Sequence, residues 1–171
     1  LRRDPSNAQA RILLGRSSLA VGDAASAEKE LRRAIELGAD ASSLYVPLVT
    51  AFVMQGKFKE ALDTGVDDSL DAAEAAALRR LRGDALQSLQ KPAEARREYE
   101  LALEEDASDV GAQLGIAATY LAEGNAAQAR SNLDRLIDEY PEDVRVWFAS
   151  AEFNRSANRI EDAKANYEVA L

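Results

Sequence analysis

Residues 110–143 read VGAQLGIAATYLAEGNAAQARSNLDRLIDEYPED, and the fold class can be inferred from the pattern of these residues. Its first apolar run extends from Leu114 to Leu121 and its second from Ala129 to Tyr140, each with the spacing of a helix face. Gly124 lies in the break between the runs, and Pro141 ends the second run. The stretch therefore predicts two helices joined by a turn. Because one such hairpin cannot bury both apolar faces by itself, it needs further copies to pack against.

The same pattern recurs every 34 residues without an insertion. When Val110 is taken as position 1, position 20 is alanine in every copy: Ala27, Ala61, Ala95, Ala129 and Ala163. Position 15, at the turn, holds Gly22, Gly56, Gln90, Gly124 and Asn158. A small residue at position 20 allows two helices to approach closely. Glycine or asparagine at position 15 suits the left-handed backbone that often follows a helix. These features predict an array of hairpins.

The array resembles the tetratricopeptide repeat, or TPR, over essentially all of the 171 residues. The TPR signature has aromatic residues near positions 4, 11 and 24, small residues at positions 8, 20 and 27, and proline at position 32. The resemblance implies an all-α fold, a right-handed TPR solenoid of about five helix-turn-helix hairpins. The expected units are 8–41, 42–75, 76–109, 110–143 and 144–171, and residues 1–7 are the expected tail of a preceding unit. We expect a single array that is a fragment of a longer solenoid.

Two signature positions differ from the TPR pattern. Position 4 is aromatic only at Tyr45 and Trp147, and we expect both rings in the hairpin core rather than on a ligand platform. Position 11 is Ser18 in the first unit and Asn154 in the fifth, which predicts looser packing of the outer repeats.

The second unit differs most from the repeat, because position 24 is Gly65 and position 27 is Asp68. The sequence predicts a helix of about two turns from Phe58, followed by a loop to about Leu70. The next helix is expected to begin early, near Asp71, since residues 72–77 are mostly alanine. The irregular segment 63–70 is a divergent repeat, a hinge or a binding loop.

Composition excludes several classes of function. A formal net charge of −9 argues against a nucleic-acid partner, which would favour a basic surface. The absence of cysteine and histidine excludes disulfides, thiolate or imidazole metal sites, and Ser/His or Cys/His catalysis. No apolar run is long enough to span a membrane, so we predict no direct membrane insertion of this segment. We expect neither a cofactor nor an enzymatic activity.

The candidate site is a groove. In the TPR family, partners usually lie in the concave groove formed by the first helix of each unit, and the resemblance places positions 2, 5, 9, 12 and 13 there. The candidate partner-binding residues are Ile12, Arg16, Leu19, Val46, Thr50, Val53, Met54, Arg80, Gln87, Leu114, Leu121, Phe148 and Arg155. The same positions include Asp84, Ala118, Arg145 and Glu152. Alternatively, some of the aliphatic side chains are buried against a neighbouring helix.

The chemistry of these positions predicts a protein or peptide partner. Aliphatic residues combined with four arginines and two carboxylates suit a peptide or helix with apolar anchors and some acidic character. TPR adaptors that hold a C-terminal carboxylate use lysine and asparagine at positions 5 and 9. Unit one has Ile12 and Arg16 there, so the resemblance does not extend to that clamp.

A narrower resemblance concerns two runs, LLGRSSLAVGDAASAEKELRRAIELGAD at 13–40 and LRGDALQSLQKPAEARREYELAL at 81–103. They look like the large TPR lipoproteins of bacterial PEP-CTERM/exosortase systems. This implies a periplasmic segment, tethered to the outer membrane, in exopolysaccharide or protein-sorting machinery. The alternatives are a cytoplasmic TPR adaptor or assembly factor, a TPR arm of a larger enzyme, and a purely structural spacer. Apolar helix faces at the ends could also allow artificial self-association.

Overall fold

The computed structural model describes residues 7–66 and 70–171 and is all-α over these residues. Within them it has ten α-helices, one 3₁₀ turn and no strand. The helices are Ala8–Ala20 (α1), Ala24–Glu36 (α2), Tyr45–Met54 (α3), Phe58–Asp63 (α4), Ala72–Ser88 (α5), Pro92–Glu105 (α6), Val110–Ala122 (α7), Ala126–Glu139 (α8), Val144–Ser156 (α9) and Ile160–Ala170 (α10). The 3₁₀ turn η1 (Ser42–Leu44) leads directly into α3. The predicted fold class is confirmed.

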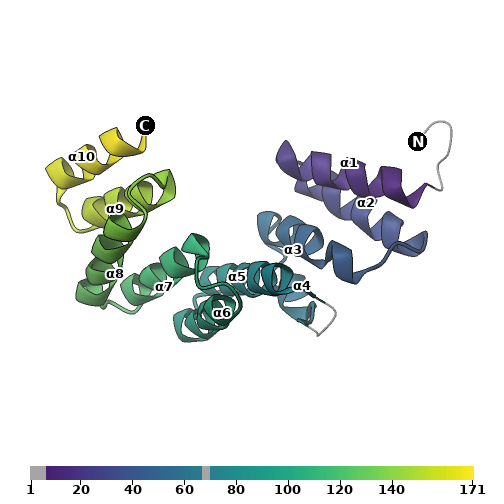
Figure 1. The fold of residues 1–171 in the computed structure, drawn as a ribbon, viewed down its shortest axis with the longest axis horizontal. Helices are drawn as coiled ribbons and strands as arrows, with labels where there is room; N and C mark the ends of the chain where they lie inside the picture. The colour runs from purple at the N-terminus through teal and green to yellow at the C-terminus, as the bar shows by residue number, and fades with distance from the viewer. Residues whose placement is uncertain (1–6, 67–69) are drawn as a thin grey trace.

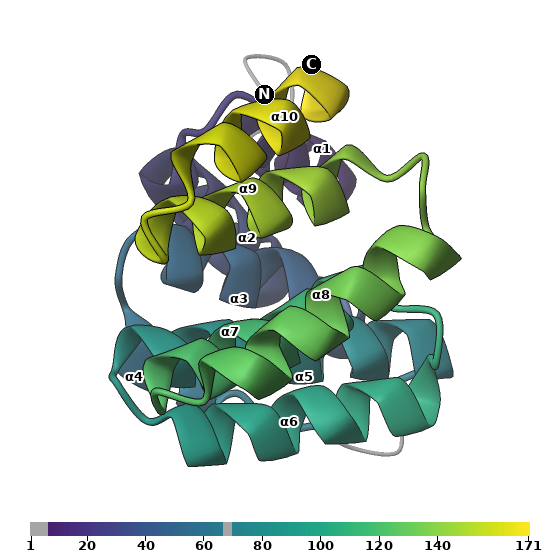
Figure 2. The same ribbon diagram turned by 90° about the vertical axis from the view of Figure 1, so that its left-hand side faces the viewer.

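The helices form successive hairpins that together make an open arc (Figure 1). The odd-numbered helices α3, α5 and α7 lie on the inner side of the arc, and α4, α6 and α8 lie on the outer side. Each outer helix also packs against the next inner one, as α2 does on α3 and α6 on α7. Figure 2 shows the two ends of the arc, with α9 and α10 in front of α1 and α2. The odd-numbered helices also pack in order, α1 on α3, α3 on α5, α5 on α7 and α7 on α9. We call them the inner helices, and together they form one continuous concave face.

The turns have the geometry that position 15 predicts. All five residues there have positive φ, from 57° at Asn158 to 81° at Gly22. A side-chain cap marks the start of α1, α2, α5, α7 and α9, where Asn7, Asp23, Asp71, Asp109 and Asp143 each accept a backbone N–H. Pro92 is at the first position of α6, where a missing N–H costs least. Local sequence thus determines where these helices begin and end.

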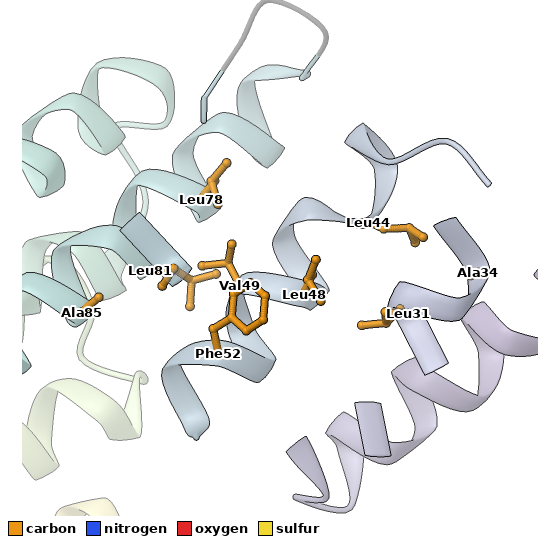
Figure 3. Packing of buried hydrophobic residues seen from close by; sticks show 10 residues of the cluster. Leu31, Ala34, Leu44, Leu48, Val49, Phe52, Leu78, Leu81 and Ala85 are labelled. Atoms are coloured by element: carbon orange, nitrogen blue, oxygen red, sulfur yellow. The ribbon is translucent and has the colours of Figure 1, made fainter. Parts of the chain in front are cut away.

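The core is continuous across the irregular second hairpin. Figure 3 shows Leu31 of α2, Leu48, Val49 and Phe52 of α3, and Leu81 of α5 in one apolar cluster. The five position-20 alanines are no more than 3% exposed, which confirms their predicted role at close helix contacts. The first three hairpins therefore share one hydrophobic core.

The expectation for the position-4 aromatics was only partly right. Tyr45 packs against the core but is only half-buried, and half-buried Trp147 donates from its indole Nε1 to the Pro141 carbonyl at 2.7 Å. The neighbouring position 3 is the buried one, since Leu44 and Val146 are both 0% exposed. Position 3 rather than position 4 therefore faces the core, from η1 in the second unit and from the first turn of α9 in the fifth.

The second hairpin is the irregular one, as predicted. The helix α4 has six residues and ends at Asp63, whereas α5 has seventeen and begins at Ala72, four residues before the start of the expected unit. Asp71 and Glu74 form a capping box, in which each side chain accepts the other's backbone N–H, so the extra turn of α5 begins at a strong cap. The predicted loop also includes Asp67, Asp68 and Ser69, which lie outside the described residues.

Candidate functional site: the concave face

A pocket opens between three inner helices near the N-terminal end of the arc. Its volume is about 510 Å³, within the range of small ligand and peptide sites. We call it the N-terminal pocket, and its lining residues are Arg16, Leu19, Ser43, Val46, Pro47, Asp71, Ala73, Glu74 and Ala77. They come from α1, from η1 and α3, and from the start of α5. The pocket therefore joins three successive hairpins.

A second pocket opens between α7 and α9 and reaches the outer helix α8. Its volume is about 330 Å³. We call it the C-terminal pocket, and its lining residues are Leu114, Ala117, Ala118, Leu121, Ala129, Leu133, Ala149, Glu152, Phe153, Arg155 and Ser156. Most of this lining is aliphatic or aromatic, and the charges of Glu152 and Arg155 are paired at 2.6 Å. It is suited to one apolar side chain of a partner.

The middle of the concave face, on α5, is polar and already paired. Arg80 lies 3.2 Å from an Asp109 carboxylate oxygen and 3.6 Å from one of Asp84. The Tyr99 hydroxyl donates to Asp84 at 2.8 Å. Gln87 donates from Nε2 to the Ala118 carbonyl at 3.3 Å. These contacts join α5 to α6 and α7, so this region stabilises the solenoid and uses most of its polar groups internally. The buried Gln87 Oε1 is the exception among these groups, since it has no hydrogen bond from the described residues.

Asp84 and Tyr99 are electrostatically perturbed by this arrangement. Burial raises the pKa of Asp84 above its usual value, although the Tyr99 hydroxyl and Arg80 act in the opposite direction. Burial, and then the nearby Asp84 carboxylate, also raises the pKa of Tyr99. Tyr99 therefore remains a neutral hydrogen-bond donor at physiological pH.

The predicted groove residues divide between the two pockets and the surface around them. Arg16, Leu19 and Val46 line the N-terminal pocket, and Leu114, Leu121 and Arg155 line the C-terminal pocket. The remaining predicted residues line neither pocket: Ile12, Thr50, Val53, Met54, Arg80, Gln87 and Phe148. Whether any of these residues binds a partner stays a prediction.

Several of the remaining residues have partners within the chain. Ile12 and Val53 pack partly buried against the core, as the alternative reading of the aliphatic positions expected. Thr50 donates to the Val46 carbonyl at 2.8 Å. Phe148 meets the Tyr167 ring edge to face at 5.7 Å. Met54 is 49% exposed on α3.

In the structure, most arginines of the predicted groove are paired with carboxylates of the same chain. Arg80, Arg145 and Arg155 are paired with Asp109, Asp143 and Glu152 at 3.2, 2.6 and 2.6 Å. Among the groove arginines, Arg16 alone has no hydrogen bond or ion pair with the residues that the structure describes. The expectation that the partner has apolar anchors and some acidic character stays a prediction, and most of the arginines on which the acidic character depended are paired with carboxylates within the chain.

Sequence reasoning missed one wall of the N-terminal pocket. Asp71, Ala73 and Glu74 lie outside the five groove positions because regular units have the end of the second helix and the following loop there. The signal was present, however, since Asp71-Ala-Ala-Glu74 before an apolar run is the pattern of a capping box. It also missed Leu133 and Phe153, which line the C-terminal pocket from α8 and from position 10 of α9.

Within residues 7–66 and 70–171, no group of three or more acidic side chains is arranged to hold a metal ion. None of the described helices is both long and apolar enough to cross a bilayer.

Hairpins that stack into an arc, with pockets on the inner helices, define a helical-repeat solenoid that presents a concave face to partners. The sequence matches the family model described as a tetratricopeptide repeat-like domain over residues 3–114 and the tetratricopeptide repeat model over residues 86–151. The chain belongs to the tetratricopeptide repeat family. A scaffold for protein–protein interaction is the function that this fold suggests.

Solved structures show the same fold. The TPR protein YrrB, described as having an unusual peptide-binding site, is 19% identical with a TM-score of 0.60, and the match covers 99% of this chain and 87% of YrrB. The MamA protein is 15% identical with a TM-score of 0.63, over 96% and 90% of the two chains. A TPR protein from Parabacteroides merdae ATCC 43184 is 21% identical with a TM-score of 0.51, over 94% and 77%. Comparison with curated proteins finds no significant match.

Proposed function

We propose that the chain is an interaction scaffold that holds a peptide or helix of a partner protein along its concave face. The observation that carries the proposal is the pair of open pockets on the inner helices, separated by a polar region that is paired within the chain. Such a face offers apolar anchoring at two places and little polar binding between them. The peptide-binding site of the similar protein YrrB is consistent with this use of the fold.

The two pockets limit the strength and the form of binding. Burying one aliphatic side chain in each contributes about 1.5–3 kcal/mol per side chain before the cost of association. A micromolar complex needs about 8 kcal/mol in total, so two anchors are insufficient alone. The partner must therefore also contact the surface between the pockets, for which a segment spanning several inner helices is better suited than a small molecule.

We also propose that this scaffold works in the bacterial periplasm, in exopolysaccharide or protein-sorting machinery, and is held at the outer membrane by a lipid elsewhere in the protein. Only the resemblance of residues 13–40 and 81–103 to the PEP-CTERM-associated lipoproteins supports this pathway. The alternatives of a cytoplasmic adaptor and an enzyme's TPR arm predict different neighbouring sequence. Labelling of the full-length protein with a radioactive fatty acid would test the lipid directly.

Site-specific photocrosslinking in a bacterial envelope extract would test the concave-face proposal. A benzophenone amino acid would replace Ala73 at the N-terminal pocket or Leu121 at the C-terminal pocket, both of which are exposed enough to tolerate it. The matched control would replace exposed Glu100, on the outer helix α6. We expect the same protein to crosslink at Ala73 and Leu121 and not at Glu100.

Two results would contradict the proposal. Crosslinking that is equal at Glu100, or stronger there, would place the interaction on the convex face. If the two inner positions gave no crosslink while the full-length protein bound a partner in the same extract, the concave face would not be the binding surface. Cooperative thermal unfolding of each variant would first show that the solenoid is intact.

A further inference from the structure

The N-terminal pocket has an uneven distribution of charge. Arg16 lies on the α1 wall, and Asp71 and Glu74 lie on the α5 wall. Between them, the side chains of Leu19, Val46, Pro47, Ala73 and Ala77 give the pocket an apolar lining. The two carboxylates therefore outnumber the one cation, in contrast to the arginine-rich groove that the five regular positions predict.

The carboxylates of the α5 wall have capacity to bind a cation. Asp71 accepts the Glu74 N–H through Oδ1 at 2.8 Å, and Glu74 accepts the Asp71 N–H through Oε2 at 3.3 Å. The other oxygen of each carboxylate, Asp71 Oδ2 and Glu74 Oε1, has no hydrogen bond from any residue that the structure describes. Neither side chain forms an ion pair with a described lysine or arginine. Each therefore keeps a negative charge and an acceptor that a ligand could use.

The same cap excludes an anionic ligand from this wall. A bare helix N-terminus attracts anions because its first N–H groups lack partners. At α5, the capping box satisfies two of these groups and adds two negative charges next to the others. A carboxylate or phosphate would thus be repelled here, whereas a lysine or arginine side chain would be attracted.

We infer that the N-terminal pocket binds a partner segment in which an aliphatic residue is adjacent to a lysine or arginine. The aliphatic side chain lies on the lining formed by Leu19, Val46 and Ala77, and the cation contacts Asp71 and Glu74. Arg16, on the opposite wall, is placed to donate to a backbone carbonyl of the same segment. This inference rests on the proposed function, and it names the chemistry of the partner that the irregular second hairpin selects.

The inference can be tested by selecting a phage-displayed library of random dodecapeptides for binding to the native chain. The most enriched sequences would be synthesised with a fluorescein label and titrated by fluorescence anisotropy against the native chain and against the double variant Asp71→Asn/Glu74→Gln. Asparagine and glutamine can still form the capping box, so the variant removes charge while keeping the turn. Glu100→Gln, on the outer helix α6, is the matched control.

We expect enrichment of a leucine-sized residue beside lysine or arginine. Affinity for the double variant should fall about five- to tenfold, because two partly exposed charge pairs are lost. Binding to the native chain should weaken with added salt, and the double variant should lose most of that salt dependence. Glu100→Gln should bind as the native chain does.

Two other outcomes can be distinguished. Peptides without a basic residue, or peptides that bind the double variant equally but lose binding with Leu121→Glu, would overturn this inference and leave a concave-face scaffold standing. If the folded native chain selected no peptide, the proposed peptide-binding function and the inference would both fail.

Discussion

The second and third hairpins share one 34-residue register, yet they use position 24 in opposite ways. In the third hairpin, position 24 is Tyr99, 2% exposed, whose ring lies against Gly83 of α5 and Gly115 of α7. In the second, position 24 is Gly65, which lies beyond the end of α4 with nothing within 4 Å of an added Cβ. A large side chain at position 24 therefore packs an outer helix against two inner helices. Where glycine takes its place, the outer helix ends early.

A side chain of the third hairpin stabilises the C-terminal end of the short helix α4. Arg82, on α5, donates from NH1 to the carbonyls of Leu62 at 2.6 Å and Thr64 at 2.9 Å, and its Nε lies 3.0 Å from Glu98. Carbonyls at the end of a helix have no partners within it, so a cation there satisfies them and interacts favourably with the helix dipole. The third hairpin thus stabilises the end of the second. Residues 72–75, which correspond to the loop between regular units, form the extra turn of α5.

The largest expected effect comes from removing the Tyr99 ring. Tyr99→Ala should lower the free energy of unfolding by about 3–5 kcal/mol, because the cavity between α5, α6 and α7 cannot close. Chemical denaturation followed by circular dichroism would measure it. Tyr99→Phe, which keeps the ring and loses the hydrogen bond to Asp84, should cost about 1 kcal/mol. Equal losses for both variants would show that the hydroxyl, rather than the ring, fastens the helices.

Adding one methyl group distinguishes the two hairpins directly. A Cβ at Gly115 would lie 2.5 Å from the Tyr99 ring, so Gly115→Ala should cost about 1–3 kcal/mol through overpacking. Gly65→Ala meets no atom and needs no positive φ, so its effect should be within about 0.5 kcal/mol. The same denaturation experiment applies to both. A loss at Gly65 as large as that at Gly115 would contradict the difference between the hairpins.

Removing the Arg82 guanidinium should affect α4 more than the whole chain. We expect Arg82→Met to cost about 1 kcal/mol, since the side chain is partly exposed and its aliphatic part is retained. Hydrogen–deuterium exchange should become faster in residues 58–66 and stay nearly unchanged in α6 and α7. Arg97→Met, at an exposed position of α6, is the control. Unchanged exchange in α4 would mean that Arg82 does not hold its end.

The smallest expected effect is a pair of opposite pH dependences. Burial raises the pKa of Asp84 above its usual 3.8, so its contribution to stability is full below about pH 4 and is lost as the pH rises through the higher folded-state pKa. The hydrogen bond from Arg145 lowers the pKa of Asp143, so its contribution is present above about pH 4 and is lost on acidification. The two groups should therefore respond to pH with opposite signs.

Asparagine variants would show these signs. Relative to the native chain, Asp84→Asn should become more stable as the pH rises from about 3 to 7, and Asp143→Asn should become less stable. Asparagine in place of Asp84 can still accept the hydrogen bond from the Tyr99 hydroxyl, and asparagine in place of Asp143 can still cap α9. Urea denaturation at several pH values would measure both trends. Trends of the same sign would contradict the opposite environments of the two carboxylates.

The sequence predicts most of the fold because its signals are local and repeated. The alanine at position 20, the turn residue at position 15 and the N-cap aspartates each act within one or two turns of a helix. The early end of the outer helix in the second hairpin was also predictable, since Gly65 cannot replace a large residue at position 24. The early start of α5 followed from the helix propensity of residues 72–77.

The candidate site was less predictable because it depends on pairs between repeats. Arg80 and Asp109 are 29 residues apart in sequence and 3.2 Å apart in space, and neither residue alone indicates the pair. The α5 wall of the N-terminal pocket depends on an irregularity, which positions carried over from regular repeats cannot describe. The divergent hairpin is therefore where the concave face of this chain differs most from that of a regular array.

A variant with a regular second hairpin would show whether the divergent hairpin forms the binding site. In one variant, residues 58–75 would be replaced by a copy of residues 126–143, the corresponding 18 residues of the fourth hairpin. The aspartate copied to residue 75 would act as the N-cap, so that α5 would begin at residue 76. The wall formed by Asp71, Ala73 and Glu74 would then be lost. The measurement is the affinity of this variant, once far-UV circular dichroism shows it folded, for the peptides selected on the native chain. We expect a folded solenoid that no longer binds these peptides. A folded variant that binds them with native affinity would contradict the role of the divergent hairpin in forming the site.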